Sequence, residues 1–418
     1  MAFKSKDVIL SALDIGTSKV SAAVCHCAEV GRLDVLGYCL QPTAGIRNGV
    51  VVDLDALSRT IEACVTETER RAQVRMKQPW VSISARGLKS FNSSGGITLG
   101  NTAVPITENH LQKCIDAARN ITLSNSLEPL HYVMRKCLVD NNLEVDNPVK
   151  MEGTRLEVGL HILALPKTQI THFTKAVNQA GLAVGKMLVE PLAAAEAVLT
   201  PEEKEFGCLL LSIGSCNTTA LIFQKGKLQH SFCLPVGGDN FTRDIIVGLR
   251  TTLAEAERVK QMFAAMDLHA IEPNEMFDIT SAGSGRTRQI ARQILAEIIQ
   301  PRTEEILEMV KASIEMAGFE NTQLTSVVLC GGGSLLNQLV PYTEKFTDIP
   351  SRLGMPVLST DLPEELHSPI HAALLGLLVK AQLGHTRRPS SLTDKFTPEL
   401  NFLQKTSARF RHWLQEIV

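Results

Sequence analysis

The residues best suited to chemistry lie in a short segment near the start of the chain. Residues 14–19 read Asp-Ile-Gly-Thr-Ser-Lys. This loop combines a glycine for close approach of a ligand, hydroxyl and N–H donors, and a cation, which together suit a phosphate group. Asp14, at the end of an apolar run, is placed to hold a hydrated Mg²⁺ ion. A loop of Asp, Gly, Thr and Ser is equally typical of a plain hairpin turn, so this segment alone leaves both interpretations open.

Three further segments favour the phosphate interpretation. Residues 331–334, Gly-Gly-Gly-Ser, follow a buried-strand candidate and precede a predicted helix, which would place a helix N-terminus at the end of a strand. Residues 190–196, Glu-Pro-Leu-Ala-Ala-Ala-Glu, predict a helix start that packs closely. Glu257 and Lys260 share one face of a helix after the glycines at 237–238 and are placed to grip a ribose. Taken singly, the last two features are also typical of helices without a ligand.

The elements that must position these residues occur twice. Residues 8–13 and 20–25 are apolar runs on either side of the first loop. Residues 208–213 and 219–223 flank a second polar loop in the same way. Such a duplication predicts two related halves, each beginning with a strand, a loop and a strand.

Helical patterns alternate with the strand-like runs. Residues 156–165 and 326–330 are predicted as strands, and a helix start is expected at 334–339. Alternating strands and helices favour an α/β layered fold. The predicted helices cover residues 106–118, 167–181, 191–199, 253–266, 290–317 and 371–383.

The composition excludes several classes of protein. The 418 residues are 44% hydrophobic and 21% charged, which is typical of a globular chain. Forty-two Lys and Arg against 44 Asp and Glu leave a net charge of -2, so no nucleic-acid partner is expected. The 10 cysteines lack metal-ligand spacing and are read as reduced thiols of a cytosolic protein. Neither a signal peptide nor a membrane-spanning helix is predicted.

In this order and spacing, the segments resemble those of the actin/Hsp70/hexokinase superfamily. The resemblance assigns phosphate loops to residues 14–19 and 212–219 and an adenosine loop to residues 327–334. It assigns connecting helices to residues 190–197 and 368–378.

Within that superfamily, the chain is most similar to the FtsA family of bacterial cell-division proteins. Residues 237–260, residues 296–302 and the amphipathic C-terminus carry this narrower resemblance. It implies an α/β, actin-like two-lobed ATPase fold with an FtsA-type 1C insertion and a C-terminal amphipathic helix. The implied parts are subdomain 1A (1–82, 167–197 and 370–383), insertion 1C (83–166), subdomain 2A (198–232 and 306–369), subdomain 2B (233–305), a linker (384–400) and the helix (401–418).

The resemblance implies a site for ATP and Mg²⁺, with Asp14 holding the metal through water. No catalytic residue is assigned. The expected nucleotide-binding residues are Asp14, Gly16, Thr17, Ser18, Lys19, Glu190, Gly214, Ser215, Cys216, Asn217, Gly237, Gly238, Glu257, Lys260, Gly331, Gly332, Gly333 and Ser334.

The second phosphate loop departs from the family pattern. FtsA relatives have Asp-Ile-Gly-Gly-Gly-Thr-Thr-Asp there, whereas residues 212–219 read Ser-Ile-Gly-Ser-Cys-Asn-Thr-Thr. Ser212 cannot replace a carboxylate in ordering metal and water, and the loss of such a group typically costs about 10²–10⁴ in rate. We therefore expect ATP to be bound as a structural ligand and hydrolysed slowly or not at all. The alternative is a site that no longer binds nucleotide.

The C-terminus predicts a membrane-surface helix. Its large apolar residues form one stripe with basic edges. Arg409 and Arg411 would each cost about 2.5–3.5 kcal/mol at the bilayer centre, so a helix lying in the interface is expected rather than a span. A helix packed on its own domain or on a partner is the alternative. The expected membrane-binding residues are Phe402, Leu403, Lys405, Arg409, Phe410, Arg411, Trp413, Leu414, Ile417 and Val418.

The family resemblance also implies partners and a location. The chain would form filaments at the division site, on the cytoplasmic face of the cell membrane and against an anionic lipid surface. It would recruit other division proteins through the 1C insertion and bind the C-terminal peptide of FtsZ. Four arginines form a locally basic stretch that suits this peptide, although such a run is usually a solvated face: Arg286, Arg288, Arg292 and Arg302.

Two other functions remain open. A pilus-assembly protein resembling PilM would share the fold and the insertion but would lack the amphipathic tail. A sugar kinase or other phosphotransferase of the superfamily would need a catalytic aspartate, and the missing acid of the second loop disfavours it. A chaperone would need a further domain, and about thirty-five residues remain after residue 383.

Overall fold

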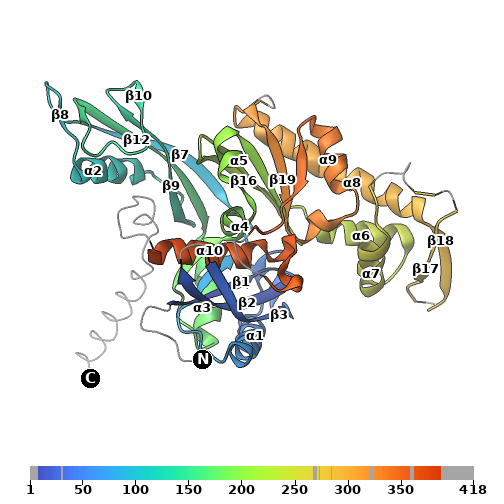
Figure 1. Ribbon diagram of the computed structural model, residues 1–418. Helices are drawn as coiled ribbons and strands as arrows, with labels where there is room; N and C mark the ends of the chain where they lie inside the picture. The colour runs from blue at the N-terminus through green and yellow to red at the C-terminus, as the bar shows by residue number, and fades with distance from the viewer. Residues whose placement is uncertain are drawn as a thin grey trace.

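The protein is described by a computed structural model in which two similar lobes face each other (Figure 1). The predicted amphipathic helix, including every predicted membrane-binding residue from Phe402 to Val418, lies outside the described residues, as does the predicted linker from residue 387 on. The linker is expected to begin at residue 384, but the last helix continues to Thr386. In the part that is described, no helix combines the length and the apolar character needed to cross a bilayer. The structure describes residues 8–29, 32–266, 271–272, 274–283, 285–320, 323–357 and 362–386.

The predicted duplication is present in the sheets. Lobe one contains a sheet of order β13-β6-β1-β2-β3, and lobe two contains one of order β16-β15-β14-β19-β20. In each sheet a three-stranded antiparallel meander continues into two parallel strands, β6 and β13 in lobe one and β19 and β20 in lobe two. The strands of lobe one are β1 (Val8–Ile15), β2 (Lys19–Glu29), β3 (Arg32–Pro42), β6 (Trp80–Ile83) and β13 (Lys186–Val189). Those of lobe two are β14 (Cys208–Ile213), β15 (Thr218–Gln224), β16 (Lys227–Leu234), β19 (Ser326–Cys330) and β20 (Ser351–Leu353).

The apolar run of β14 is buried on both faces of its sheet. Cys208 and Leu210 belong to the core shared with lobe one, whereas Leu209, Leu211 and Ile213 belong to the core on the opposite face. Alternate side chains of a strand point to opposite faces, so a continuous apolar sequence suits a strand with helices on both sides. The outer face is covered by α6 (Gly238–Leu249) and α8 (Arg292–Met316).

Two helices form the layer between the lobes. They are α4 (Glu190–Val198) and α10 (Ala372–Thr386), which cross in direct contact between the two sheets (Figure 1). A β-carbon on Gly376 would lie 1.7 Å from the carbonyl oxygen of Ala193. The predicted close packing of the small-residue helix therefore depends on a glycine in the partner helix. Lobe one also contains α1 (Leu54–Ala72) and α3 (Lys167–Gln179), and lobe two contains α5 (Pro201–Phe206) and α9 (Leu339–Thr347).

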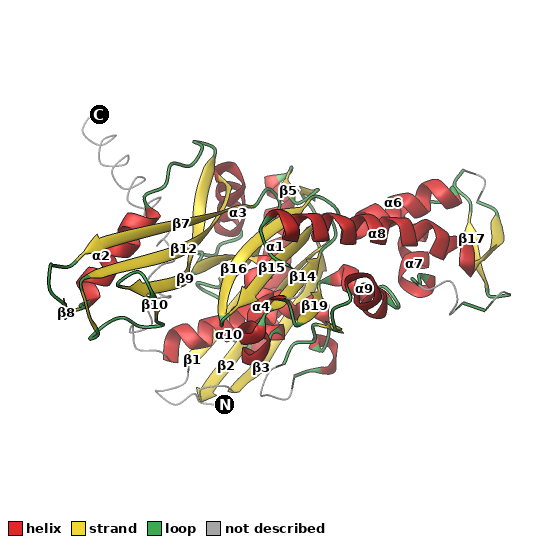
Figure 2. Cartoon of the chain, turned by 90° about the horizontal axis from the view of Figure 1, so that it is seen from above, coloured by secondary structure: helices red, strands yellow, loops and turns green. Residues whose placement is uncertain are grey.

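Each lobe carries an additional unit at a different place. In lobe one the inserted subdomain, residues 84–166, follows β6 and has its own core, in which α2 (Glu108–Arg119) packs on a sheet of order β10-β9-β12-β7. In lobe two the unit follows β16 and contains α6, α7 (Leu253–Phe263) and the hairpin of β17 (Met276–Thr280) and β18 (Thr287–Ala291). Figure 2 shows the two units at opposite ends of the molecule. The strands of the inserted subdomain are β7 (Lys89–Thr98), β8 (Val104–Pro105), β9 (Leu127–Val139), β10 (Leu143–Glu144), β11 (Glu152–Gly153) and β12 (Arg155–Pro166).

Two sequence expectations are altered in detail. The helix expected to start at residue 334 is a single 3-10 turn, Gly332–Leu335, and α9 begins at Leu339 because Gln338 adopts a left-handed conformation with φ 64°. The boundary expected between subdomains 2B and 2A, at residue 305, falls inside α8, which continues from Arg292 to Met316 through Pro301.

Candidate functional site

The two predicted phosphate loops have the same backbone geometry. The amide of Gly16 donates to the carbonyl of Lys19 at 2.9 Å, and the amide of Gly214 donates to the carbonyl of Asn217 at 2.9 Å. A β-carbon at Gly16 would lie 3.0 Å from the Lys19 oxygen, and one at Gly214 would lie 3.2 Å from the Asn217 oxygen. Glycine is thus the natural residue at the same point of both turns, although the second loop has lost its other glycines.

The fold brings the two loops into contact. The hydroxyl oxygen of Thr17 lies 3.2 Å from the sulfur of Cys216. The Ser84 hydroxyl, just beyond the end of β6, lies 3.5 Å from the side-chain oxygen of Asn217. The loops therefore face each other across the gap between the lobes, about two hundred residues apart in the sequence.

Between the lobes lies a cavity of about 590 Å³, a volume in the usual range for sites that enclose a small organic ligand. All of the predicted nucleotide-binding residues except Cys216, Gly237 and Ser334 line it. Those three support the wall instead. Cys216 contacts Thr17, Gly237 is the N-cap residue of α6 and lies against the carbonyl oxygen of Gly214, and the Ser334 hydroxyl donates to the Gly331 carbonyl at 2.7 Å.

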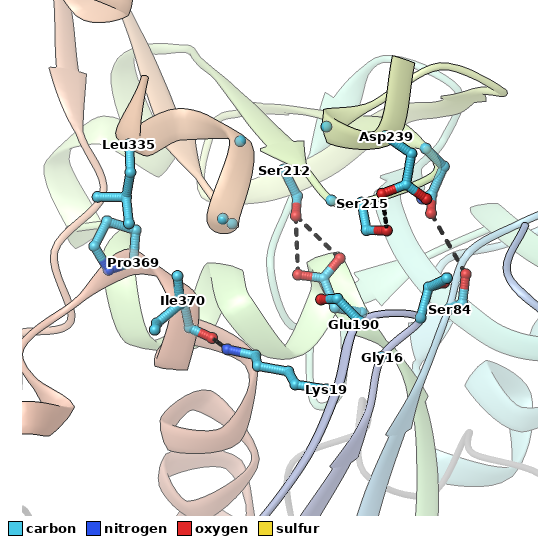
Figure 3. A pocket seen from close by; sticks show the side chains of 18 of the residues that line it. Gly16, Lys19, Ser84, Glu190, Ser212, Ser215, Asp239, Leu335, Pro369 and Ile370 are labelled. Atoms are coloured by element: carbon cyan, nitrogen blue, oxygen red, sulfur yellow. Dashed lines mark hydrogen bonds between the residues drawn. The ribbon is translucent and has the colours of Figure 1, made fainter. Parts of the chain in front are cut away.

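Charged groups gather at the foot of the cavity (Figure 3). The carboxylate of Asp14 accepts a hydrogen bond of 2.7 Å from Ser82, and the ammonium of Lys19 donates to the carbonyl of Ile370. Burial raises the pKa of Asp14, against the opposing effect of Lys19. Burial likewise lowers the pKa of Lys19, although the carboxylates of Asp14 and Glu190 oppose that shift. Both groups are held where their charge is costly, as expected of groups arranged for a charged ligand.

Glu190 lies opposite the altered residue of the second loop. The Ser212 hydroxyl is 2.9 and 3.0 Å from the two carboxylate oxygens of Glu190 (Figure 3). Burial, with a smaller contribution from Asp14, raises the pKa of Glu190 to about 7. At the position where the family pattern leads us to expect an acid, Ser212 therefore donates a hydrogen bond to the carboxylate of Glu190.

The predicted ribose pair forms on one face of α7. The ammonium of Lys260 is 2.8 Å from the carboxylate of Glu257, 2.6 Å from the Thr242 hydroxyl and 3.2 Å from the Gly238 carbonyl. The Thr242 hydroxyl also donates to Glu257. Both side chains line the cavity and are hydrogen-bonded to residues of α6. The predicted i, i+3 pair therefore forms as an ion pair that α6 holds in place.

Several lining residues escaped the sequence analysis. Leu335, Leu336, Pro369 and Ile370 supply an apolar wall next to the Gly331–Gly333 turn, which suits the face of a base. The sequence offered one clue to these residues. Leu335 and Leu336 come shortly after the three glycines, and Pro369 and Ile370 come just before α10. Ile15 and Ser212 lie within the two predicted phosphate loops, although neither was named as a nucleotide-binding residue. The remaining unpredicted lining residues are Ser84, Asp239, Phe241, Gln261 and Ala373.

The donor set suits a hydrated metal bound together with a ligand rather than a metal bound by protein alone. Asp14, Glu190, Asp239 and Glu257 all line the cavity. Among the described residues, however, no three His, Cys, Asp or Glu side chains gather closely enough to hold a metal ion. Mg²⁺ usually keeps several waters and binds one or two carboxylates together with phosphates. The site therefore fits a metal bound through water and ligand oxygens.

The four arginines of the predicted peptide site separate into two pairs. Arg286 and Arg288 are exposed on the β17–β18 hairpin, and Arg288 donates to the carbonyl of Leu249. Arg292 is bonded to Glu275 at 3.0 and 2.9 Å, and Arg302 is bonded to both carboxylate oxygens of Asp244 at 2.7 and 3.0 Å.

Comparison with known sequences gives a consistent result. The family model "Cell division protein FtsA" matches residues 209–376, and the model "SHS2 domain inserted in FTSA" matches residues 86–164. The chain is 31% identical over 379 residues to the cell division protein FtsA of Pseudomonas aeruginosa, covering 91% of this chain and 90% of the relative.

Comparison with solved structures gives the same fold. The chain aligns with a structure of the PilM-PilN type IV pilus biogenesis complex with a TM-score of 0.62 and 18% identity, covering 90% of this chain and 98% of that chain. It also aligns with MreB5 of Spiroplasma citri bound to ADP, with a TM-score of 0.55 and 13% identity, covering 91% of this chain and 99% of that chain. At these identities the likeness establishes an actin-like fold.

Proposed function

The chain belongs to the FtsA family of cell-division proteins, and from this premise we propose that it tethers FtsZ filaments to the inner face of the cytoplasmic membrane at the division site. It would assemble there into filaments and recruit further division proteins through the inserted subdomain. The observation that carries the proposal is the 31% identity to an FtsA, which extends over 91% of the chain and so includes both lobes and the insertion. The pilus-assembly alternative has the support of a shared fold at 18% identity.

The cleft supports binding of ATP with Mg²⁺. The two glycine turns and Lys19 would hold the phosphates, Glu257 and Lys260 the ribose, and the wall of Leu335, Pro369 and Ile370 the base. Asp14 would hold the metal through water. When bound, Mg²⁺ would neutralise phosphate charge beside the carboxylates of the cleft.

Ser212 and Glu190, which would lie near the phosphates of bound ATP, favour slow hydrolysis of ATP or none. Ser212 donates to Glu190 and carries no negative charge that could order metal and water. Glu190 has a pKa raised to about 7, so near neutral pH it is only partly ionised. We therefore propose that bound ATP acts mainly as a structural ligand that favours assembly.

The membrane anchor is the predicted amphipathic helix of residues 401–418. Its support is the sequence pattern of an apolar stripe with basic edges, together with the family. The test is co-sedimentation of the full chain with vesicles containing phosphatidylglycerol, with and without Mg-ATP. The double variant Phe410→Glu with Trp413→Glu should lose most of the pelleted protein, because each carboxylate disrupts the apolar stripe.

Phe206→Glu provides the matched control, because Phe206 is 68% exposed on α5 and lies outside the tail. It should pellet like the unaltered chain. A tail variant that still pellets on anionic vesicles would contradict the anchor. Greater pelleting with Mg-ATP would support nucleotide-dependent assembly.

A further inference from the structure

Strand β16 connects the cleft with the inserted subdomain. Its C-terminal end, Leu234, pairs with Thr218 of β15 in the last part of the second phosphate loop, and the chain then enters the Gly237–Gly238 corner of the cleft. Its other end, near Lys227, lies beside the inserted subdomain (Figure 2). A displacement of the second loop therefore acts on a strand whose far end contacts another subdomain.

The outer part of this contact consists of charged pairs. The ammonium of Lys225 lies 2.8 Å from the carboxylate of Glu144, and that of Lys227 lies 2.6 Å from the carboxylate of Asp146. Both acids belong to the inserted subdomain. Because one partner of each pair, Lys225 or Asp146, is well exposed to solvent, these pairs orient the subdomain more than they stabilise it.

The inner part is a buried polar junction centred on His161. Its ring nitrogens lie 2.6 Å from the side-chain oxygen of Asn92 and 2.8 Å from the hydroxyl of Ser231 in β16. The hydroxyl of Ser90 donates to the carbonyl of Ser231 at 2.6 Å. Three strands of two subdomains thus share one hydrogen-bonded network, which holds them rigidly together.

A second contact joins the start of the inserted subdomain directly to the second phosphate loop. The guanidinium of Arg86 donates to the carbonyl of Cys216 at 3.3 Å, and the amide of Arg86 donates to the hydroxyl of Ser84 at 3.3 Å. The turn at Gly49 packs against both Arg86 and Cys216. Arg86 therefore holds the backbone of the loop from outside the cavity, where phosphates would contact it from inside.

We propose that Arg86 and β16 couple the nucleotide state of the cleft to the position of the inserted subdomain. The proposal rests on the proposed nucleotide site. Phosphates bound between the two loops would contact the backbone of residues 214–217. Arg86 is hydrogen-bonded to the same backbone at Cys216, and the chain continues from there into β15 and β16. A ligand shifts a conformational equilibrium only through contacts that differ between states, and in this proposal the contact of Arg86 with the Cys216 carbonyl is the one that changes. The inserted subdomain then presents its partner-binding faces according to whether nucleotide is bound.

The test combines nucleotide binding with hydrogen exchange in the full chain. Affinity for a fluorescent ATP analogue in Mg²⁺ is measured first, and hydrogen exchange is then followed in peptides covering β9, β12 and β16 with and without nucleotide. In the unaltered chain, nucleotide should slow exchange in these peptides. Arg86→Ala should remove that response and weaken affinity about fivefold or more, while Arg86→Lys should keep part of both effects.

Controls separate coupling from loss of structure. Arg59→Ala removes an exposed arginine of α1 and should change neither readout. Lys227→Glu should reduce the response in β9 and β12, and the charge exchange Lys227→Glu with Asp146→Lys should restore it. Thermal unfolding should show all variants folded at the assay temperature.

The outcomes distinguish the coupling from the nucleotide site. Binding without any change in exchange of the inserted subdomain overturns the coupling and leaves the nucleotide site standing. A full exchange response in the folded Arg86→Ala variant also overturns the role of Arg86. Absence of nucleotide binding by the unaltered chain overturns both.

Discussion

At the scale of single residues, the contact between Ser212 and Glu190 determines what the cleft can do. A serine hydroxyl is neutral and donates to a carboxylate, whereas an aspartate at the same place would face Glu190 with a like charge. Two carboxylates that share a site raise the pKa of one of them, unless a cation lies between them. The serine therefore spares Glu190 a like charge at this place when no cation is bound.

Ser212→Asp tests this interpretation. In metal-free buffer the variant should be about 1–3 kcal/mol less stable, because a donated hydrogen bond is replaced by repulsion. Thermal unfolding with EDTA and with Mg-ATP should show a larger gain from Mg-ATP for the variant than for the unaltered chain. Ser212→Asn, which adds similar volume without charge, is the control. An equal Mg-ATP gain for Ser212→Asp and Ser212→Asn would contradict the expectation.

Glu190 predicts a pH dependence of stability. Its pKa is about 7 in the folded protein and near 4.5 in the unfolded chain, so between these values the folded state binds more protons. Stability should consequently fall as pH rises from about 4.5 to about 7 and level off above that range. Glu190→Gln lacks this titration, and its stability relative to the unaltered chain should rise through the same window.

The measurement is thermal unfolding of both proteins in nucleotide-free buffer across that range. Glu202→Gln, at an exposed position on α5, is the matched control. A pH-independent difference for Glu190→Gln would show that the carboxyl titrates near its ordinary pKa in the folded protein.

At the scale of elements, the crossing of α4 and α10 sets the distance between the lobes. The alanines of α4 lie against Gly376, where no β-carbon can be accommodated without displacement of the helix backbone. Glu190 is the first residue of α4. Ile370, whose carbonyl accepts a hydrogen bond from Lys19, lies just before the start of α10. The distance between α4 and α10 therefore determines how far Glu190 lies from Ile370 and its partner Lys19.

Gly376→Ala should separate these helices. The added methyl group should cost about 1–3 kcal/mol of stability or more, since the close contact is with backbone rather than with a flexible side chain. Denaturant unfolding measures the loss, and nucleotide affinity should fall with it. Gly100→Ala is the control, because a β-carbon there would lie 3.4 Å or more from its neighbours. Equal stability of the two variants would contradict the packing argument.

At the scale of the whole molecule, the hairpin arginines of the peptide site proposed for FtsZ lie in the unit of lobe two that is at the opposite end of the molecule from the inserted subdomain (Figure 2). The four arginines of this site differ in whether an acidic side chain already binds them. Arg302 is held by Asp244 in a bidentate pair between α8 and α6, whereas Arg288 is exposed on the hairpin. We expect the hairpin to supply affinity and Arg302 to supply stability.

Arg288→Glu should weaken binding of the acidic FtsZ peptide about fivefold at low salt and less at high salt. Arg302→Glu should chiefly lower the unfolding temperature, since it leaves Asp244 facing a like charge. Peptide titration by fluorescence anisotropy and thermal unfolding measure the two effects. Arg75→Glu, exposed in lobe one, is the charge-matched control. If Arg288→Glu left the peptide affinity unchanged, the hairpin would not be part of the peptide-binding site.

The sequence by itself determined the local units of this protein. The two glycine loops, the strand pairs around them and the braced Glu257 and Lys260 pair could be predicted because each depends on residues close together in the chain. The same holds for the start of α4 and for the long helix α8, whose periodicity and flanking residues are local.

Tertiary structure alone decided which distant residues meet. The contact of Thr17 with Cys216, the apolar wall next to Ile370 and the attachment of the inserted subdomain to β16 join segments between about thirty-five and two hundred residues apart. No local pattern records such pairs, because they result from packing the sheets of both lobes against α4 and α10. Ser212 could be identified from the sequence as a missing acid, but only the fold showed that its hydroxyl is bonded to Glu190.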